Sequence, residues 1–216
     1  MNKEWSEKNK KMQSLIRKKE SFEEGIAVLL ELREDLFSQI TSIVNTCPEE
    51  AFCGMPFARA KGYHSKTLGY SMWHIFRIED IVAHTLIRQD DQILFAEDWL
   101  NRINSPIITT GNELTGEEIA KFSEKLDIRA LYDYCNAVKD STNELLKDLQ
   151  YKDLKRKFTD DDRERIIETG SVSKDEDAFW LIDYWCGKDI KGLIQMPFSR
   201  HWIMHIEAMC RIKNAL

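Results

Sequence analysis

Large apolar residues recur every three or four positions along most of this chain, which is the spacing of one face of an α-helix. Such runs cover residues 22–44, in a helix that Pro48 is expected to end, and then about 65–89, 127–149 and 197 onward. Strict alternation of apolar and polar residues, which indicates a half-buried strand, is almost absent. The pattern predicts an all-α fold, a four-helix bundle with extra short helices.

Local signals predict where several helices begin. A Ser or Thr followed three residues later by Glu forms a capping box, and the chain contains this pattern at Ser21, Thr115 and Ser173. Asp127 is placed to cap the third long helix. Pro197 is tolerated in the first turn of the last helix, because the N–H that it lacks has no partner there.

Two charged segments differ from this helical pattern. Residues 1–20 are rich in lysine and are expected to form an N-terminal extension, either a short amphipathic helix or a frayed end packed by Trp5. Residues 21–216 are expected to form one helical domain. The acidic and basic segment 152–165 lacks the glycine and late glutamate of a calcium loop, so it is expected to be a solvated loop.

Composition excludes several classes of protein. A formal net charge of −6 opposes non-specific binding to nucleic acid, which requires a basic surface. No apolar run approaches the length of a membrane span or of a signal peptide. The five cysteines are odd in number and form no CxxC, so they are expected to be reduced thiols. We therefore expect a soluble cytoplasmic protein.

Histidines on the last helix provide the candidate chemistry. His201 and His205 are one helical turn apart, so both imidazoles project from one face and can reach a common ion. His64, His74 and His84 remain as sources of a third ligand, and the last two lie about 80° apart around the second helix, so they cannot easily share an ion. Three imidazoles leave an open coordination position, which is typical of a catalytic metal site. Glutamate does not follow His201, so this is not the HExxH pattern of a zinc protease.

The segment 67–79, TLGYSMWHIFRIE, together with the late His201-x-x-x-His205, resembles the DinB/YfiT-like superfamily. Those proteins are four-helix bundles of unusual connectivity, with one metal-ligand histidine on the second helix and two on the last. Order, separation and helix placement match over roughly residues 21–214. The resemblance implies that His74, His201 and His205 hold one divalent metal, zinc or nickel first, with iron or manganese as alternatives. It also implies a homodimer.

Two functions from different classes are compatible with such a site. The resemblance implies a metal-dependent enzyme that transfers a low-molecular-weight thiol (bacillithiol, mycothiol or glutathione) to a small electrophile, or a metal-dependent hydrolase, and the sequence does not choose between these. The alternative is a non-enzymatic, stress-associated helical-bundle protein that binds a metal or a small ligand. An enzyme needs an open coordination position that faces a pocket, so the structure can separate the two.

Other side chains are candidates for supporting roles. A ligating histidine usually donates its second N–H to an oxygen. The candidate acceptors are Glu79, Asp183, Tyr184 and Glu207. Arg77 and Arg200 flank the histidines and are candidates for holding a substrate carboxylate, with helix-surface ion pairs as the alternative. Four tryptophans can line a pocket or fill the core: Trp73, Trp180, Trp185 and Trp202. The loop 47–65 is expected to cover the electrophile pocket.

Overall fold

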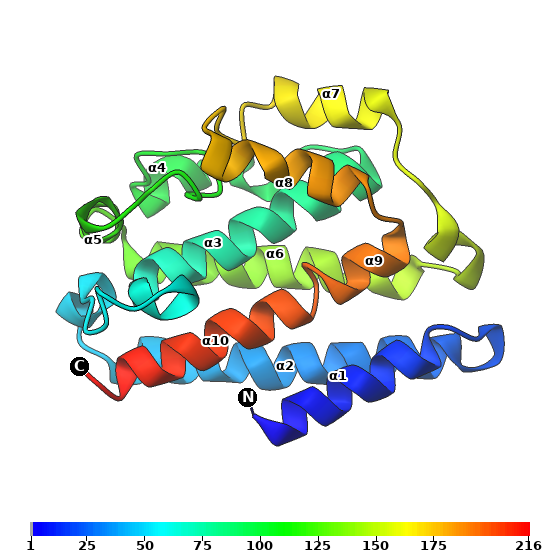
Figure 1. Ribbon diagram of the computed structural model, residues 1–216, viewed down its shortest axis with the longest axis horizontal. Coiled ribbons are helices and arrows are strands. Elements are labelled where there is room, and N and C mark those ends of the chain that lie inside the picture. The colour runs from blue at the N-terminus through cyan, green and yellow to red at the C-terminus, as the bar shows by residue number, and fades with distance from the viewer. Residues whose placement is uncertain (1) are drawn as a thin grey trace.

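A computed structural model describes residues 2–216, and within that range the chain is helical, with no strand (Figure 1). The prediction of an all-α fold is confirmed. The four long helices are α2 (Phe22–Thr46), α3 (Leu68–Asp80), α6 (Ile128–Asp148) and α10 (Arg200–Lys213). Both α2 and α3 pack against α6 and α10, so the four helices surround one core.

Six further α-helices among the described residues complete the fold. They are α1 (Lys3–Leu15), α4 (Trp99–Ile103), α5 (Glu117–Ser123), α7 (Asp160–Glu168), α8 (Glu176–Cys186) and α9 (Ile190–Gln195). Single 3-10 turns cover Lys19–Ser21, Glu49–Cys53, Gly62–Ser65, Ile93–Phe95 and Tyr151–Lys155. A π-helix, Ile81–Arg88, continues α3 directly. In Figure 1, α1 and α2 lie along one side of the molecule, and α7 and α8 lie along the other.

The N-terminal extension contains a real helix. Asn2 caps α1 through its side-chain oxygen, and α1 packs along α2. Trp5, Met12 and Ile16 are buried in the core. The charged residues of this segment therefore cover an apolar stripe, and the amphipathic-helix alternative is the one that the structure contains.

A buried ion pair connects the long helices. Arg33 of α2 donates two hydrogen bonds to the carboxylate of Glu79 on α3, at 2.7 and 2.9 Å, and both side chains are fully buried. Asn143 of α6 accepts from Arg33 Nε at 2.7 Å. Trp202 of α10 donates its indole N–H to Glu79 at 2.8 Å. One carboxylate and one guanidinium therefore fix all four long helices relative to one another.

Two of the predicted capping boxes are wrong. Ser21 lies in a 3-10 turn and donates its hydroxyl to the Leu15 carbonyl at 2.8 Å, closing the turn between α1 and α2. Asp175, not Ser173, caps α8 by accepting from the Asp177 N–H. At Thr115 the Glu118 carboxylate does reach back to the N–H at 3.0 Å, although α5 begins after Gly116. Asp127 caps α6 as predicted.

The segment 152–165 is not a loop throughout. It contains the start of α7, and Thr159 with Asp162 forms a capping box that the sequence analysis did not identify. Asp160 and Asp161 occupy the first turn of α7, where the positive end of the helix dipole stabilises carboxylates. The three aspartates that we predicted to be loop residues are therefore a helix-start signal.

The last long helix begins later than predicted. Residues 190–195 form the separate helix α9, and α10 starts at Arg200 after a non-helical Ser199. Pro197 lies between these helices, after a cis peptide bond, so its predicted place in the first turn is wrong. Across residues 2–216, none of the helices combines the length and the apolar composition needed to cross a lipid bilayer.

Candidate metal centre

The structure brings three histidines together, all from residues singled out in the sequence. His74 projects from α3, and His201 and His205 project from one face of α10, so that one nitrogen from each lies within 4.8 Å of the other two. Their exposed fractions are 6, 6 and 2% respectively. His74 Nε2 and His201 Nε2 are 3.3 Å apart. These three buried histidines lie close enough to bind one metal ion.

The orientation of His74 is fixed by the main chain. Its Nδ1–H donates to the Thr110 carbonyl at 2.9 Å, so in the neutral ring the lone pair is on Nε2 and points into the cluster. The ring also stacks on Tyr70, with the centroids 5.4 Å apart and the planes 13° from parallel. A metal-ligating histidine usually donates its other ring N–H to an oxygen, as His74 does to the Thr110 carbonyl.

A ladder of side-chain donors on α3 holds the Thr110 carbonyl in place. Tyr70 donates to the Gly111 carbonyl at 3.1 Å, Trp73 donates to the Thr109 carbonyl at 2.9 Å, and Arg77 donates to the Ile108 carbonyl at 2.8 Å. With His74, these donors recur at helical spacing along one face of α3. The irregular segment 108–111 therefore finds partners for its carbonyls on α3, and we call this arrangement the carbonyl ladder.

The other two histidines have nitrogens without partners. Within the described chain, His201 Nδ1 and both ring nitrogens of His205 are buried and form no hydrogen bond. Burial lowers the pKa of His74 to about 4, with an opposing contribution from the Thr110 hydrogen bond and a smaller lowering by Lys66. Burial, followed by the neighbouring imidazoles, lowers the pKa of His201 and His205 well below the ordinary value. All three rings are therefore neutral at physiological pH, the form in which imidazole can bind a metal.

These features fit a divalent metal. Buried polar atoms normally have a partner, and neither ring nitrogen of His205 has one, so an ion within reach of one of them would supply the missing partner. Zinc–nitrogen bonds of about 2.0–2.1 Å in tetrahedral geometry place two ligand nitrogens about 3.3–3.4 Å apart. The 3.3 Å between His74 and His201 matches that spacing.

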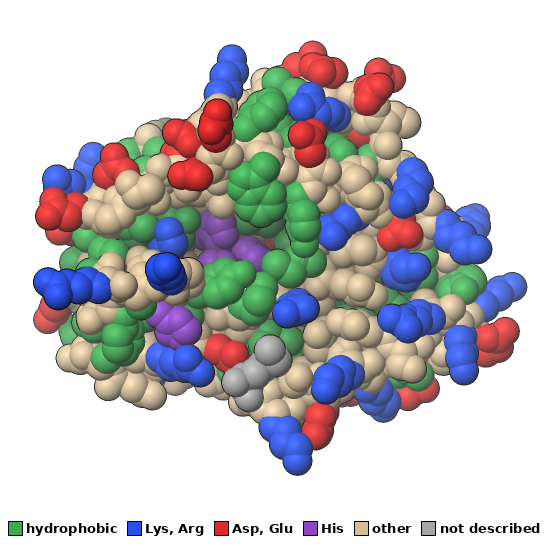
Figure 2. Space-filling model, viewed as in Figure 1, with side chains coloured by type: hydrophobic (Ala, Val, Ile, Leu, Met, Phe, Trp, Pro, Cys, Tyr) green, Lys and Arg blue, Asp and Glu red, His purple; other side chains and the backbone are tan. Residues whose placement is uncertain are grey.

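The cluster opens onto a cavity of about 220 Å³. Its lining is largely apolar and aromatic, and besides the three histidines it consists of Tyr63, Ile78, Asn112, Trp180, Leu181, Tyr184, Trp185, Met196 and Pro197. Figure 2 shows histidine side chains exposed to this face between apolar side chains. A cavity therefore adjoins the cluster, but α8 forms much of its wall, and of the loop 47–65, which was expected to cover it, only Tyr63 lines it.

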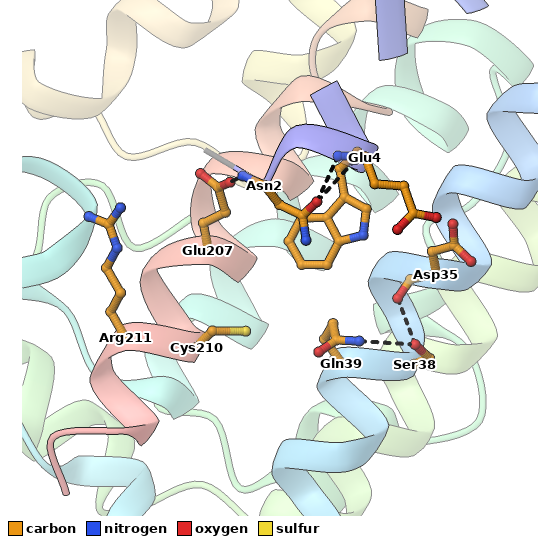
Figure 3. Close-up of a pocket in the computed structure, with 9 residues that line it drawn as sticks. Asn2, Glu4, Asp35, Ser38, Gln39, Glu207, Cys210 and Arg211 are labelled. Atoms are coloured by element: carbon orange, nitrogen blue, oxygen red, sulfur yellow. Dashed lines mark hydrogen bonds between the residues drawn. The ribbon is translucent and has the colours of Figure 1, made fainter. Parts of the chain in front are cut away.

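Several predicted supporting residues lie elsewhere. Glu79 pairs with Arg33, and Asp183 pairs with Arg163 at 2.9 Å. Glu207 accepts a hydrogen bond from the Asn2 N–H at a separate hollow between α1, α2 and α10 (Figure 3). None of the three carboxylates is a histidine partner in the structure.

Arg77 and two of the four tryptophans do not lie where they could contact a substrate. Arg77 is fully buried and pairs with Asp80, so it cannot hold a substrate carboxylate. Trp73 and Trp202 fill the core, whereas Trp180 and Trp185 line the cavity.

The remaining histidines are outside the cluster. His84 contacts Asp90 at 2.7 Å and Ser141 at 3.1 Å, and His64 contacts Arg211 at 2.9 Å. The sequence could not predict that the Thr110 carbonyl is the hydrogen-bond partner of His74, because a backbone acceptor on an irregular segment leaves no signal in the residue types.

Tyr70→Phe tests the carbonyl ladder. The substitution keeps the ring that stacks on His74 and removes only the hydrogen bond to Gly111, so the Thr110 carbonyl is held less firmly. We expect zinc affinity to fall about threefold to tenfold, since one hydrogen bond contributes about 0.5–1.5 kcal/mol. Competition with a chromogenic chelator measures this. Tyr132→Phe, which removes a hydroxyl bonded to Thr41 far from the cluster, should leave the affinity unchanged.

No protein-family model matches the chain, and neither does any curated protein. The resemblance to the DinB/YfiT-like superfamily therefore stays a prediction from the residues around the three histidines.

Proposed function

We propose that this chain is a metal-dependent enzyme of the DinB/YfiT-like type, in which α2, α3, α6 and α10 form the four-helix bundle. In this proposal His74, His201 and His205 hold one divalent ion, zinc or nickel first. The observation that carries it is the cluster of three buried imidazoles, with one nitrogen from each within 4.8 Å of the other two, which lines an open cavity. A non-enzymatic site that only holds a metal has no need of that opening.

The proposed reaction is transfer of a low-molecular-weight thiol to a small electrophile. A divalent metal at such a site supplies a positive charge that lowers the pKa of a bound thiol or water toward neutrality. Hydrolysis also benefits from a general base within hydrogen-bond reach of the attacking water. The residues that line the cavity include neither Asp nor Glu. This lining favours thiol transfer over hydrolysis.

The chain's own residues contribute positioning and exclusion of water. Thr110 fixes His74 in the tautomer that presents Nε2 to the cluster. Tyr63 packs edge-on against His205, with the ring centroids 4.5 Å apart, and covers the cluster from the loop side. Trp180, Trp185 and Pro197 form apolar walls suited to a hydrophobic electrophile.

The test is metal content by elemental analysis of untagged protein, purified without added metal. We expect about one zinc, nickel or iron per chain, lost in His201→Ala and retained in His64→Ala. Protein that contains a metal should then be assayed for conjugation of thiols to a chromogenic electrophile. Failure to take up zinc or nickel at neutral pH, where the histidines are unprotonated, would overturn the proposal.

A further inference from the structure

The histidine cavity adjoins a second hollow on the same side of the molecule. This hollow has a volume of about 410 Å³, and Tyr184 and Met196 line both it and the histidine cavity. Its other lining residues are Gln13, Lys188, Gly192, Gln195, Arg200 and Met204. We call it the basic hollow, because its only charged lining residues are Lys188 and Arg200.

Neither cation of the basic hollow has a counter-ion within the described residues. Lys188 Nζ lies 4.1 Å from the centre of the Tyr184 ring, on the wall shared with the histidine cavity. Arg200 is exposed, and its side chain lines the same hollow as Lys188. Among residues 2–216, no carboxylate forms an ion pair with either side chain.

A third cation lies near the cluster. Lys66 Nζ is 4.7 Å from the Tyr70 ring, which itself stacks on His74. It likewise has no carboxylate partner in the described part of the chain. The chain as a whole carries a formal net charge of −6. A surface that concentrates unpaired positive charge around one opening, on a protein of this net charge, attracts anions to that opening.

We propose that the thiol substrate of the metal site is an elongated molecule with a carboxylate at its far end. Its thiol enters the histidine cavity, while its carboxylate binds Lys188 and Arg200. This inference rests on the proposed function and names the class of its substrate. Tyr184 and Met196 contact the chain of atoms that joins the two ends. The carboxylate gains charge-assisted hydrogen bonds, which are stronger than neutral ones.

Two thiols of matched length test the inference. Cobalt-substituted protein is titrated with 6-mercaptohexanoate and with 6-mercaptohexanol, which differ only in the terminal group. Calorimetry gives both dissociation constants, and the thiolate-to-cobalt absorption band reports coordination. We expect the carboxylate to bind about tenfold more tightly. The double variant Lys188→Gln, Arg200→Gln should remove that preference and leave cobalt content and mercaptohexanol binding unchanged. Lys147→Gln, at an exposed position of α6, should change nothing.

The outcomes separate this inference from the proposed function. Equal affinities for the two thiols, or a preference that survives in the double variant, would overturn the carboxylate substrate while the metal site stands. Binding of neither thiol overturns it as well. A carboxylate preference without the cobalt–thiolate band would support the basic hollow and refute thiol coordination. Protein that takes up no cobalt overturns both proposals.

Discussion

Glu79→Ala lowers the free energy of unfolding by about 3–5 kcal/mol, the cost of leaving one partner of a buried ion pair without its counter-ion. Glu79 accepts two hydrogen bonds from Arg33 and one from Trp202, and all three side chains are fully buried. The alanine variant leaves the Arg33 guanidinium buried and uncompensated. Urea unfolding, with the slope compared to that of the parent, measures the loss.

Two controls separate the ion pair from general disruption. Glu34→Ala removes a partly exposed carboxylate that lies 3.3 Å from Lys139, and we expect it to cost less than about 1 kcal/mol. The double variant Arg33→Met, Glu79→Leu removes both charges and should be more stable than Glu79→Ala alone. If Glu79→Ala costs no more than Glu34→Ala, the pair does not fix the four helices as we describe.

The metal-free protein loses stability as pH falls from about 7 to about 5.5, by roughly 4 kcal/mol from the three histidines together. Their pKa values are depressed in the folded state by burial, to about 4 for His74. The unfolded chain therefore binds more protons than the folded chain once the pH is below about 6.5, so acid favours unfolding. For His74 the effect continues until the folded ring itself is protonated, near a pH of about 4.

One substitution isolates this effect from other titrating groups. His201→Asn removes one of the three rings and leaves a neutral side chain. Unfolding is measured in urea with a chelator present, at several pH values below about 6.5. The slope of stability against pH should be smaller in the variant by about 1.4 kcal/mol per pH unit. Identical slopes would show that the His201 imidazole is protonated in the folded protein.

Helical periodicity predicted the long elements well. The apolar runs 22–44 and 65–89 correspond to α2 and to α3 with its π-helical continuation. These runs report which side chains are buried, and burial dominates helix stability in a packed protein.

Helix starts were less predictable. Ser21 and Asp175 show why: a hydroxyl or carboxylate caps only if the local backbone turns it toward free N–H groups.

The histidine cluster could be anticipated only in part. The i, i+4 spacing placed His201 and His205 on one face, and the superfamily resemblance selected His74 over His84. Periodicity alone could not make that choice, because both residues are buried on the same long helix. Periodicity also could not show which arginine is free to bind a substrate. Arg77 is buried with Asp80, whereas Arg200 is exposed beside the cavity. Whether an arginine is paired or free depends on neighbours distant in the sequence.

The carbonyl ladder has a consequence for how this protein tolerates mutation. The acceptor of the His74 N–H belongs to the peptide backbone, which every amino acid carries, so substitution at Thr110 does not delete it. The side chains at positions 108–110 can therefore vary between related chains while the histidine keeps its tautomer, whereas Gly111 has a φ of 77° and no space for a Cβ beside Tyr70. The constraint falls instead on the donors Tyr70, Trp73 and Arg77. A comparison of related chains should therefore find the conserved residues of the site on α3 and, within segment 108–111, at Gly111 alone.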